Sequence, residues 1–170
     1  MAILLIHGRR QKRLLKIIGV IIIFFSSVMI ASILAEKADS TLRSVVALRT
    51  ILEHTKTMID CYSLPASEIL RRVDISLFFD CGYSKNTPPR DFESFIQCSK
   101  IDDAEAYELF FSFADGFGKS YRQDELSRCS LYLEKMRSRE QKIIKESAKK
   151  KKVIFTVAIS ASLAVIILII

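Results

Sequence analysis

Two apolar stretches without a charged residue lie near the ends of the chain, at residues 17–35 and 153–170, and a longer mixed stretch separates them. As α-helices both would be about 27–28 Å long, close to the hydrocarbon thickness of a bilayer, about 30 Å. We therefore expect two membrane-spanning helices. A signal peptide is the alternative for the first stretch. Its apolar run is longer than the usual run of about 7–15 residues, and Ile33 is too large for a cleavage site, so we favour an uncleaved span.

Between these stretches the apolar residues recur at helical spacing, and few segments show the alternation of a strand. We expect helices at 40–62, at 66–79, from Pro89 onward, and after a cap at Asp102-Asp103. The stripe of the first helix consists of Val45, Leu48, Leu52, Thr55, Ile59 and Tyr62. The fourth helix should end at 116–118, because the glycines there accept the left-handed conformation of a helix end.

The fifth expected helix is long, since no Pro or Gly follows Gly118. Ser120 and Gln123 have the spacing of a capping box at its start. Its apolar residues follow the 3–4 spacing of a coiled-coil seam, which Glu140 interrupts: Leu126, Cys129, Leu133, Met136 and Ile143. We expect this helix to run from Tyr121 into the second apolar stretch. A kink at the lysine run 149–152, where like charges repel, is the alternative.

The predicted fold is therefore all-α. A membrane helical hairpin encloses a small cytosolic bundle of about five helices, and the last helix continues into the C-terminal span. The predicted parts are a basic tail at 1–16, a first transmembrane helix at 17–35, the bundle at 36–152 and a second transmembrane helix at 153–170.

The positive charge of the chain is concentrated beside its apolar stretches. The formal net charge is +7, yet all 19 acidic residues lie in the middle segment. The tail contributes Arg9, Arg10, Lys12, Arg13 and Lys16. Basic flanks of this kind orient a span and contact anionic lipid, so we expect contact with membrane lipid and no binding of nucleic acid.

Motifs of catalysis and metal binding are missing from the sequence. Cys61, Cys81, Cys98 and Cys129 lack metal-site spacing, and only two histidines occur. The acidic cluster of Asp102, Asp103 and Glu105 is better explained as a solvated helix start than as a metal site. We therefore predict a protein that is not an enzyme and has no catalytic residue, metal or cofactor, and whose cysteines are reduced and mostly buried.

Small residues recur at intervals of four in both apolar stretches, at Ser27 and Ala31 and at Ala158 and Ser162. Such spacing lets helix backbones approach closely in lipid, where packing drives association. We predict that these four residues form a membrane-packing face.

Several segments together resemble stage III sporulation protein AB. They are Leu48–Glu53 with Met58-Ile59, Tyr62, Leu64-Pro65 and Glu68; Glu108–Ser120; Leu131–Glu134; and the terminal lysines with their apolar anchor. The resemblance extends over 16–170. It departs at Glu125, where that family usually has Gln, and at Ala158 and Ser162, where it usually has two glycines.

The resemblance implies a platform subunit of the channel between mother cell and forespore, similar to the inner-membrane F protein of type II secretion and type IV pilus machines. It implies a location in the mother-cell membrane facing the forespore, with the middle domain in the cytoplasm. The implied partners are the stage III sporulation AA ATPase and other channel subunits, and a homo-oligomer is compatible with this role. We predict a non-enzymatic scaffold whose partner surface is Phe117, Lys119, Tyr121 and Arg122. The alternative is a small membrane sensor that transmits a signal through its long helix.

The charges give two opposite indications of topology. Lys145 and 149–152 favour a cytoplasmic middle domain, whereas the five basic residues of the tail favour a cytoplasmic N-terminus. Two explanations reconcile them. Either a tail of 16 residues is short enough to cross, or residues 1–13 are not native and the protein starts near Leu14, where the resemblance begins.

Overall fold

The computed structural model describes the backbone of residues 2–62 and 64–169, and side chains at 18, 19, 21–62, 64–165 and 167. Throughout this described part the regular elements are α-helices only, which confirms the predicted all-α class. The chain divides into two compact units. One comprises Met1–Lys37 and Ser147–Ile170, and the other Ala38–Glu146.

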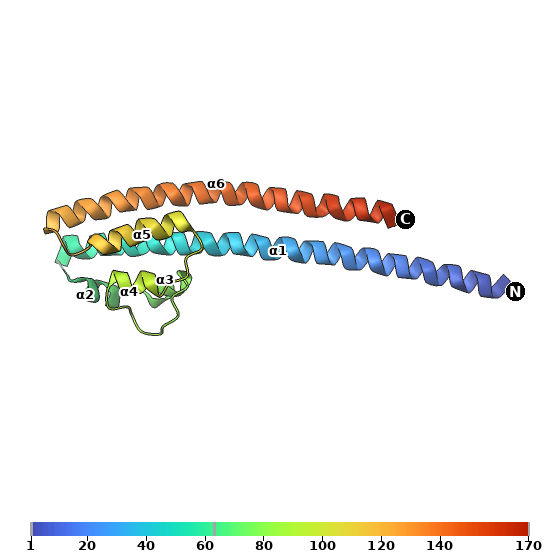
Figure 1. The fold of residues 1–170 in the computed structure, drawn as a ribbon, viewed down its shortest axis with the longest axis horizontal. Coiled ribbons are helices and arrows are strands. Elements are labelled where there is room, and N and C mark those ends of the chain that lie inside the picture. Colours follow the sequence, from blue (N-terminus) through green and yellow to red (C-terminus); the bar gives the residue numbers. More distant parts are fainter. Residues whose placement is uncertain (1, 63, 170) are drawn as a thin grey trace. The chain divides into compact units, whose positions relative to one another are not determined.

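The first helix, α1, runs from Ala2 to Tyr62 without a break (Figure 1). The sequence contains neither Gly nor Pro between Gly19 and Pro65, so nothing ends a helix there. We predicted separate helices at 17–35 and 40–62, and α1 joins them. Within its described residues, 21–62 include a stretch long and apolar enough to cross a membrane, with a mean hydropathy of 1.9.

The last helix, α6, is likewise unbroken from Arg122 to Ile169 (Figure 1). It continues through the lysine run 149–152, so the helix is not interrupted there. Its start lies one residue later than expected, which excludes Ser120 as the cap residue next to the helix. The side chains of the predicted basic tail, 1–16, lie outside the described residues.

Four short helices connect α1 with α6: α2 (Ala66–Arg71), α3 (Ile75–Asp80), α4 (Phe92–Gln97) and α5 (Ala104–Gly116). The single helix predicted at 66–79 is wrong, because Asp74 breaks it. Asp74 has an extended backbone, with ψ of 127°, and its carboxylate accepts a hydrogen bond from the Ser76 amide at 2.9 Å. This is a helix cap, and it starts α3 as a new helix.

The third predicted helix starts at Phe92 and not near Pro89. Asp91 and Ser94 form a capping box here: the Asp91 carboxylate accepts from the Ser94 amide at 2.7 Å, and the Ser94 hydroxyl from the Asp91 amide at 3.4 Å. Asp103 caps α5 in the same way, accepting from the Ala106 amide at 2.9 Å.

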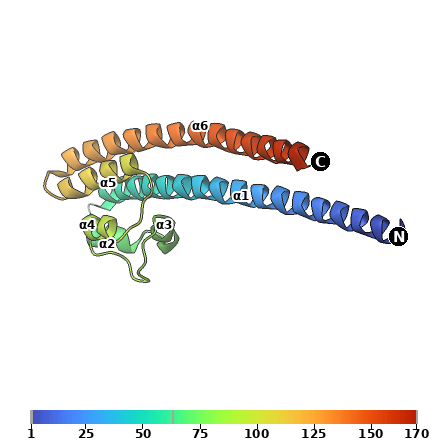
Figure 2. The same cartoon turned by 45° about the vertical axis from the view of Figure 1, so that its right-hand side comes forward.

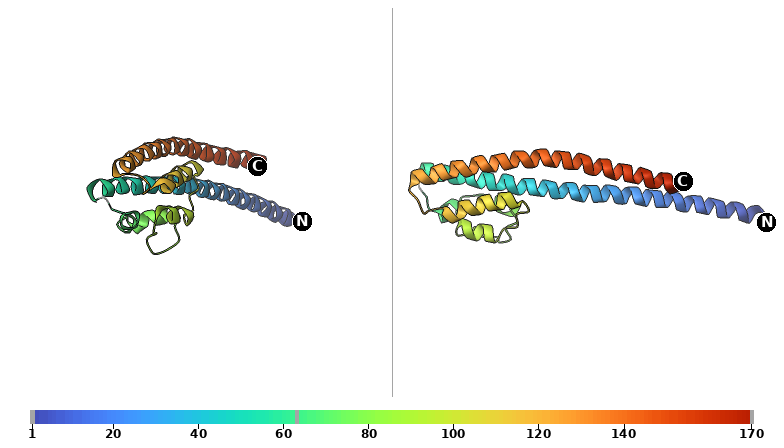
Figure 3. Two further views of the ribbon diagram at one scale, coloured as in Figure 1. Left: turned by 60° about the vertical axis from the view of Figure 1, so that its left-hand side comes forward. Right: turned by 45° about the horizontal axis from the view of Figure 1, so that its top comes forward.

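The core of the 38–146 unit is rich in aromatic rings. Phe95 contacts Phe78 and Phe110, with ring centroids 5.2 and 5.5 Å apart, and Phe113 of α5 contacts Tyr132 of α6 at 5.8 Å. In Figures 2 and 3, α5 lies beside α4. The contact between Phe95 and Phe110 joins these two helices. The predicted stripe of α1 is buried except for Tyr62, which is 61% exposed.

Candidate partner surface at the turn between α5 and α6

The turn that joins α5 to α6 contains the four residues predicted as a partner surface. Phe117 leaves the helical conformation, with ψ of 135°, and its amide donates to the Ala114 carbonyl at 3.2 Å. Gly118 has a φ of +79°, which is the left-handed conformation that its place after α5 predicts. The following residues, 119–121, lead into the first turn of α6.

Phe117 is only partly exposed. Its ring lies 4.7 Å from the Phe92 ring and 5.4 Å from the Phe113 ring, measured between centroids. The side chain therefore closes one end of the aromatic core, and a partner could contact only its outer edge.

Lys119 and Tyr121 are both exposed. Tyr121 is 84% exposed. The Lys119 ammonium lies 3.3 Å from the Asp115 carboxylate, in an exposed pair of little energetic weight. Tyrosine is among the residues that are enriched at protein–protein interfaces.

Arg122 holds the end of α1. Its Nε donates to the Ile59 carbonyl at 3.2 Å, and a terminal nitrogen donates to the Asp60 carbonyl. The same guanidinium lies 3.5 Å from the Asp60 carboxylate. The last carbonyls of a helix lack partners within it and carry partial negative charge, so a cation is favourable there. Arg122 thus has a structural role that the sequence pattern did not reveal.

Glu125 completes the turn from the first turn of α6. One of its oxygens accepts a hydrogen bond from the Gly118 amide at 3.1 Å, and its own amide donates to the Tyr121 carbonyl at 3.0 Å. We expected Ser120 and Gln123 to form a capping box. The turn is instead ordered by the hydrogen bond that the Glu125 carboxylate accepts from the Gly118 amide. Glu125 was missed as a site residue. Its position one turn before Cys129 on the seam was the available signal.

A pocket of about 360 Å³ opens beside this turn, between the end of α1, the start of α2 and the start of α6. Its walls are mainly apolar: Ile59, Leu64, Pro65, Ala66, Phe117 and Gly118. Arg122 and Glu125 supply the charged groups. The predicted surface therefore borders a recess that also involves α1 and α2.

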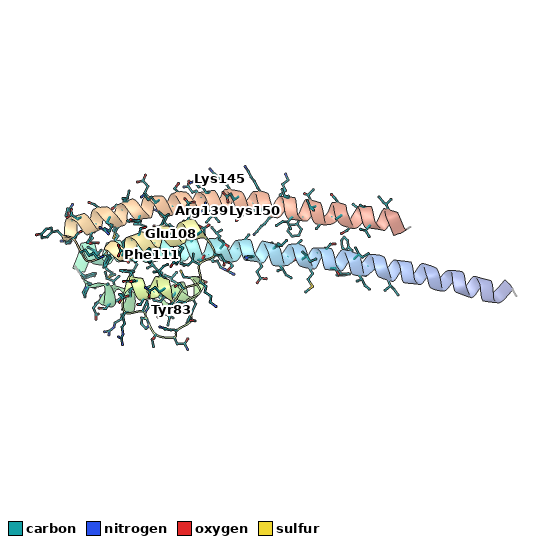
Figure 4. All side chains as sticks on the ribbon, in the orientation of Figure 1. Tyr83, Glu108, Phe111, Arg139, Lys145 and Lys150 are labelled. Carbon is teal, nitrogen blue, oxygen red and sulfur yellow. The ribbon has the colours of Figure 1, made fainter. Side chains whose placement is uncertain are left out.

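Two further groups of charges stabilise this unit. Arg139, labelled on α6 in Figure 4, makes a two-pronged contact with Asp103, at 3.0 and 2.6 Å. It also lies 2.8 Å from Glu105. The hydrogen bond with Asp103 raises the pKa of Arg139. Asp103 does cap α5, but it is buried, so the solvated start that we expected is wrong for this residue. Glu140, at its interrupted seam position, lies 2.7 Å from Arg49 of α1.

The predicted membrane-packing residues belong to the other unit. Ala31 and Ser162 are almost fully buried, with 1% and 2% of their surface exposed, while Ser27 and Ala158 are partly buried. The Ser162 hydroxyl donates to the Ala158 carbonyl at 2.7 Å, which satisfies it within α6. An apolar pocket of about 330 Å³ is lined from both helices by Ser27, Ala31, Val157 and Ala158, among others.

Residues 94–170 match the family model described as stage III sporulation protein AB. Over these residues the chain is similar to that family. The match supports the predicted family and a sporulation-related role. No curated protein and no solved structure matches the chain significantly.

The matched region begins within α4 and contains all of α5 and α6. The turn 117–122, Glu125 and Arg139 are therefore within it. Of the two aromatic partners of Phe117, Phe113 lies inside the match and Phe92 just outside it. The resemblance quoted for 48–68 remains a prediction.

Proposed function

We propose that this chain is a membrane scaffold subunit of the sporulation channel, and that its helical bundle docks a cytosolic secretion ATPase. The family match supports a role in sporulation. The observation that carries the proposal is that α1 and α6 each pass without interruption from an apolar segment into the bundle. A chain built in this way anchors a folded body to a bilayer at two points.

In this proposal the apolar segments form a hairpin in the mother-cell membrane. Close approach at Ala31 and Ser162 supports the pairing, since small residues allow backbone packing in lipid. Lys145 and the run 149–152 favour a cytoplasmic bundle. Figure 4 shows Lys145 and Lys150 on α6, and both are exposed.

The docking surface is the exposed part of the turn, Lys119 and Tyr121, with Phe117 and Arg122 behind it. The double variant Lys119→Glu, Tyr121→Ala tests this surface without removing the contacts of Arg122 to α1. Lys85→Glu is the matched control, because Lys85 is an exposed lysine in another loop, between α3 and α4.

The test is co-purification with the stage III sporulation AA ATPase from sporulating cells. The intact chain and Lys85→Glu should recover the ATPase equally, and the double variant should recover at least about tenfold less, a loss of 1.4 kcal/mol or more in binding. Equal recovery by all three proteins would contradict the docking surface. Failure of the intact chain to recover any ATPase would contradict the proposed function.

A further inference from the structure

A recess of about 370 Å³ is lined by α2 and by the loop that leads into α4. We call it the arginine recess. Two cations, two hydroxyls and two prolines form its walls: Arg71, Arg90, Ser67, Thr87, Pro88 and Pro89. The four polar residues are all exposed, so a dissolved ligand can reach them. The described residues that line the recess include no carboxylate, so the charge of its walls is wholly positive.

Three of these polar side chains have no partner among the described residues. Ser67, Thr87 and Arg90 form no side-chain hydrogen bond or ion pair with the described part of the chain. Two hydroxyls and a guanidinium at one recess are therefore available to an acceptor from outside the chain.

Arg71 is only partly engaged. Its Nη1 lies 3.2 Å from the Glu68 carboxylate, and 69% and 43% of the two side chains are exposed. An exposed ion pair of this kind contributes little. A guanidinium carries five N–H donors, and Glu68 is not part of the lining. Arg71 therefore keeps donors for a second acceptor.

The carboxylate that follows Arg90 in the sequence does not neutralise the recess from within. Asp91 lies outside the lining, and its carboxylate accepts from the Ser94 amide at 2.7 Å at the start of α4. On the other side of Arg90, Pro88 and Pro89 have fixed φ angles. This part of the loop is therefore stiff, which lowers the entropy cost of binding a ligand.

We propose that the arginine recess binds a phosphate group, either as inorganic phosphate or as a small soluble phosphate monoester. Guanidinium groups form two-pronged hydrogen bonds with phosphate oxygens. Donors come from two elements, Ser67 and Arg71 of α2 and Thr87 and Arg90 of the loop. Such a set suits the three terminal oxygens of a phosphate monoester better than the two oxygens of a carboxylate.

The size of the recess leaves room for the organic part of a small ligand. Its volume of about 370 Å³ lies within the range of ligand pockets, about 300–1,000 Å³. Pro88 and Pro89 offer that part an apolar wall without an N–H donor. This inference does not depend on ATPase docking, because none of the six lining residues belongs to the proposed docking surface.

The first experiment compares three probes on the full-length protein in detergent micelles: inorganic phosphate, glycerol 3-phosphate and succinate, a dicarboxylate. The methyl NMR signal of Thr87, which lines the recess, reports binding. The phosphate probes should bind at least about tenfold more tightly than succinate, the equivalent of one charge-assisted hydrogen bond. If one phosphate probe binds more tightly than the other, it identifies the source, and equal binding shows that the phosphate group alone is recognised. Equal affinity for succinate, or no response to either phosphate probe, overturns the proposal.

The second experiment removes one cation at a time. Arg90→Gln and Arg71→Gln should each weaken phosphate binding about tenfold. Arg72→Gln is the matched control: Arg72 is an exposed arginine next to Arg71, but it lies outside the lining, and its guanidinium is 5.9 Å from the Tyr62 ring. This variant loses the same charge and should keep the affinity. An equal loss in Arg72→Gln and Arg90→Gln would show attraction to general positive charge and would overturn the site.

Discussion

Replacement of Gly82 meets both a conformational and a steric obstacle. Its φ is +71°, and a Cβ added there would lie 2.8 Å from the Lys100 carbonyl oxygen and 2.9 Å from the Lys100 Cβ. The Lys100 amide donates to the Cys81 carbonyl at 3.0 Å, so the backbone at Lys100 cannot move away from Gly82 without losing this hydrogen bond. Gly82 therefore fixes where the chain returns after α4.

Gly82→Ala should lower the free energy of unfolding by more than the cost of the left-handed conformation alone, about 1–2 kcal/mol. Gly118→Ala is the matched control: its φ is +79°, but no atom lies within 4 Å of the added Cβ, so it should lose only the conformational part. Chemical unfolding in detergent, followed by circular dichroism, measures both. Equal losses would show that the contact with Lys100 contributes nothing.

Single residues of the core were predictable where a regular period placed them. The stripe of α1 and the seam residues Cys129, Leu133, Met136 and Ile143 are buried as the 3–4 spacing indicated. The prediction that Tyr62 is buried was wrong, because Tyr62 is the last residue of α1, where the helix no longer faces the core. The roles of Arg122 and Glu125 could not be assigned from the sequence. The partners of Arg122, Asp60 and Ile59, lie 62 and 63 residues away along the chain. The partner of Glu125, Gly118, lies in a turn whose conformation the sequence does not specify.

At the scale of elements, the helices that lack internal breakers were the predictable ones. The absence of Pro and Gly predicted the length of α6, and the same argument applied to α1 would have predicted its continuity. The break between α2 and α3 was missed because Asp74 has good apolar neighbours on both sides, and only its extended backbone shows that it caps a new helix. Short helices depend on such tertiary context more than on period.

The start of α4 offers a direct test of capping. Asp91→Ala removes the hydrogen bond to the Ser94 amide and should cost about 1 kcal/mol, whereas Asp91→Asn should cost only a few tenths, because Asn is an equally good cap. The capped helix carries Phe92, Phe95 and Ile96 into the core. Urea unfolding at neutral pH compares the two variants with the native chain.

The same residue predicts an acid effect of definite sign. Hydrogen bonds from the Ser94 amide and then its side chain lower the pKa of Asp91 below its ordinary value. The cap therefore stabilises the fold fully above the unfolded-state pKa, about 3.9, and this contribution is lost as pH falls through the lower folded-state pKa. The native chain should lose more stability than Asp91→Asn across that interval. Parallel curves for the two proteins would contradict it.

The contact of Arg122 with the end of α1 joins two long elements. Arg122→Ala leaves the Ile59 and Asp60 carbonyls without this donor and should cost about 1–3 kcal/mol. Asp60→Asn removes only the exposed ion pair at 3.5 Å and should cost at most about 1 kcal/mol. Unfolding curves of the two variants test the ranking, and a larger loss for Asp60→Asn would show that the carboxylate, not the carbonyls, is the partner.

At the scale of the whole molecule, the division into compact units places the lysine run with the apolar segments. The bundle was predicted at 36–152, and the compact unit is Ala38–Glu146, so the lysine run belongs to the unit of the apolar segments. Basic residues at this position bind the headgroups of anionic lipid and resist transfer across a bilayer. In the proposed topology, these lysines favour a cytoplasmic bundle.

The topology can be tested at one cysteine. Cys61 is exposed, whereas Cys81 and Cys129 are buried, and burial together with the charge of Glu125 raises the pKa of Cys129 to about 12. Because a thiol reacts as its thiolate, Cys61 should react rapidly in the folded protein and the two buried thiols should not.

A charged maleimide that cannot cross a bilayer should leave Cys61 unmodified in intact cells and modify it after lysis, if the bundle is cytoplasmic. Cys61→Ser is the control, and it should abolish the rapid labelling after lysis. Labelling of Cys61 in intact cells would place the bundle outside the cytoplasm and refute ATPase docking there.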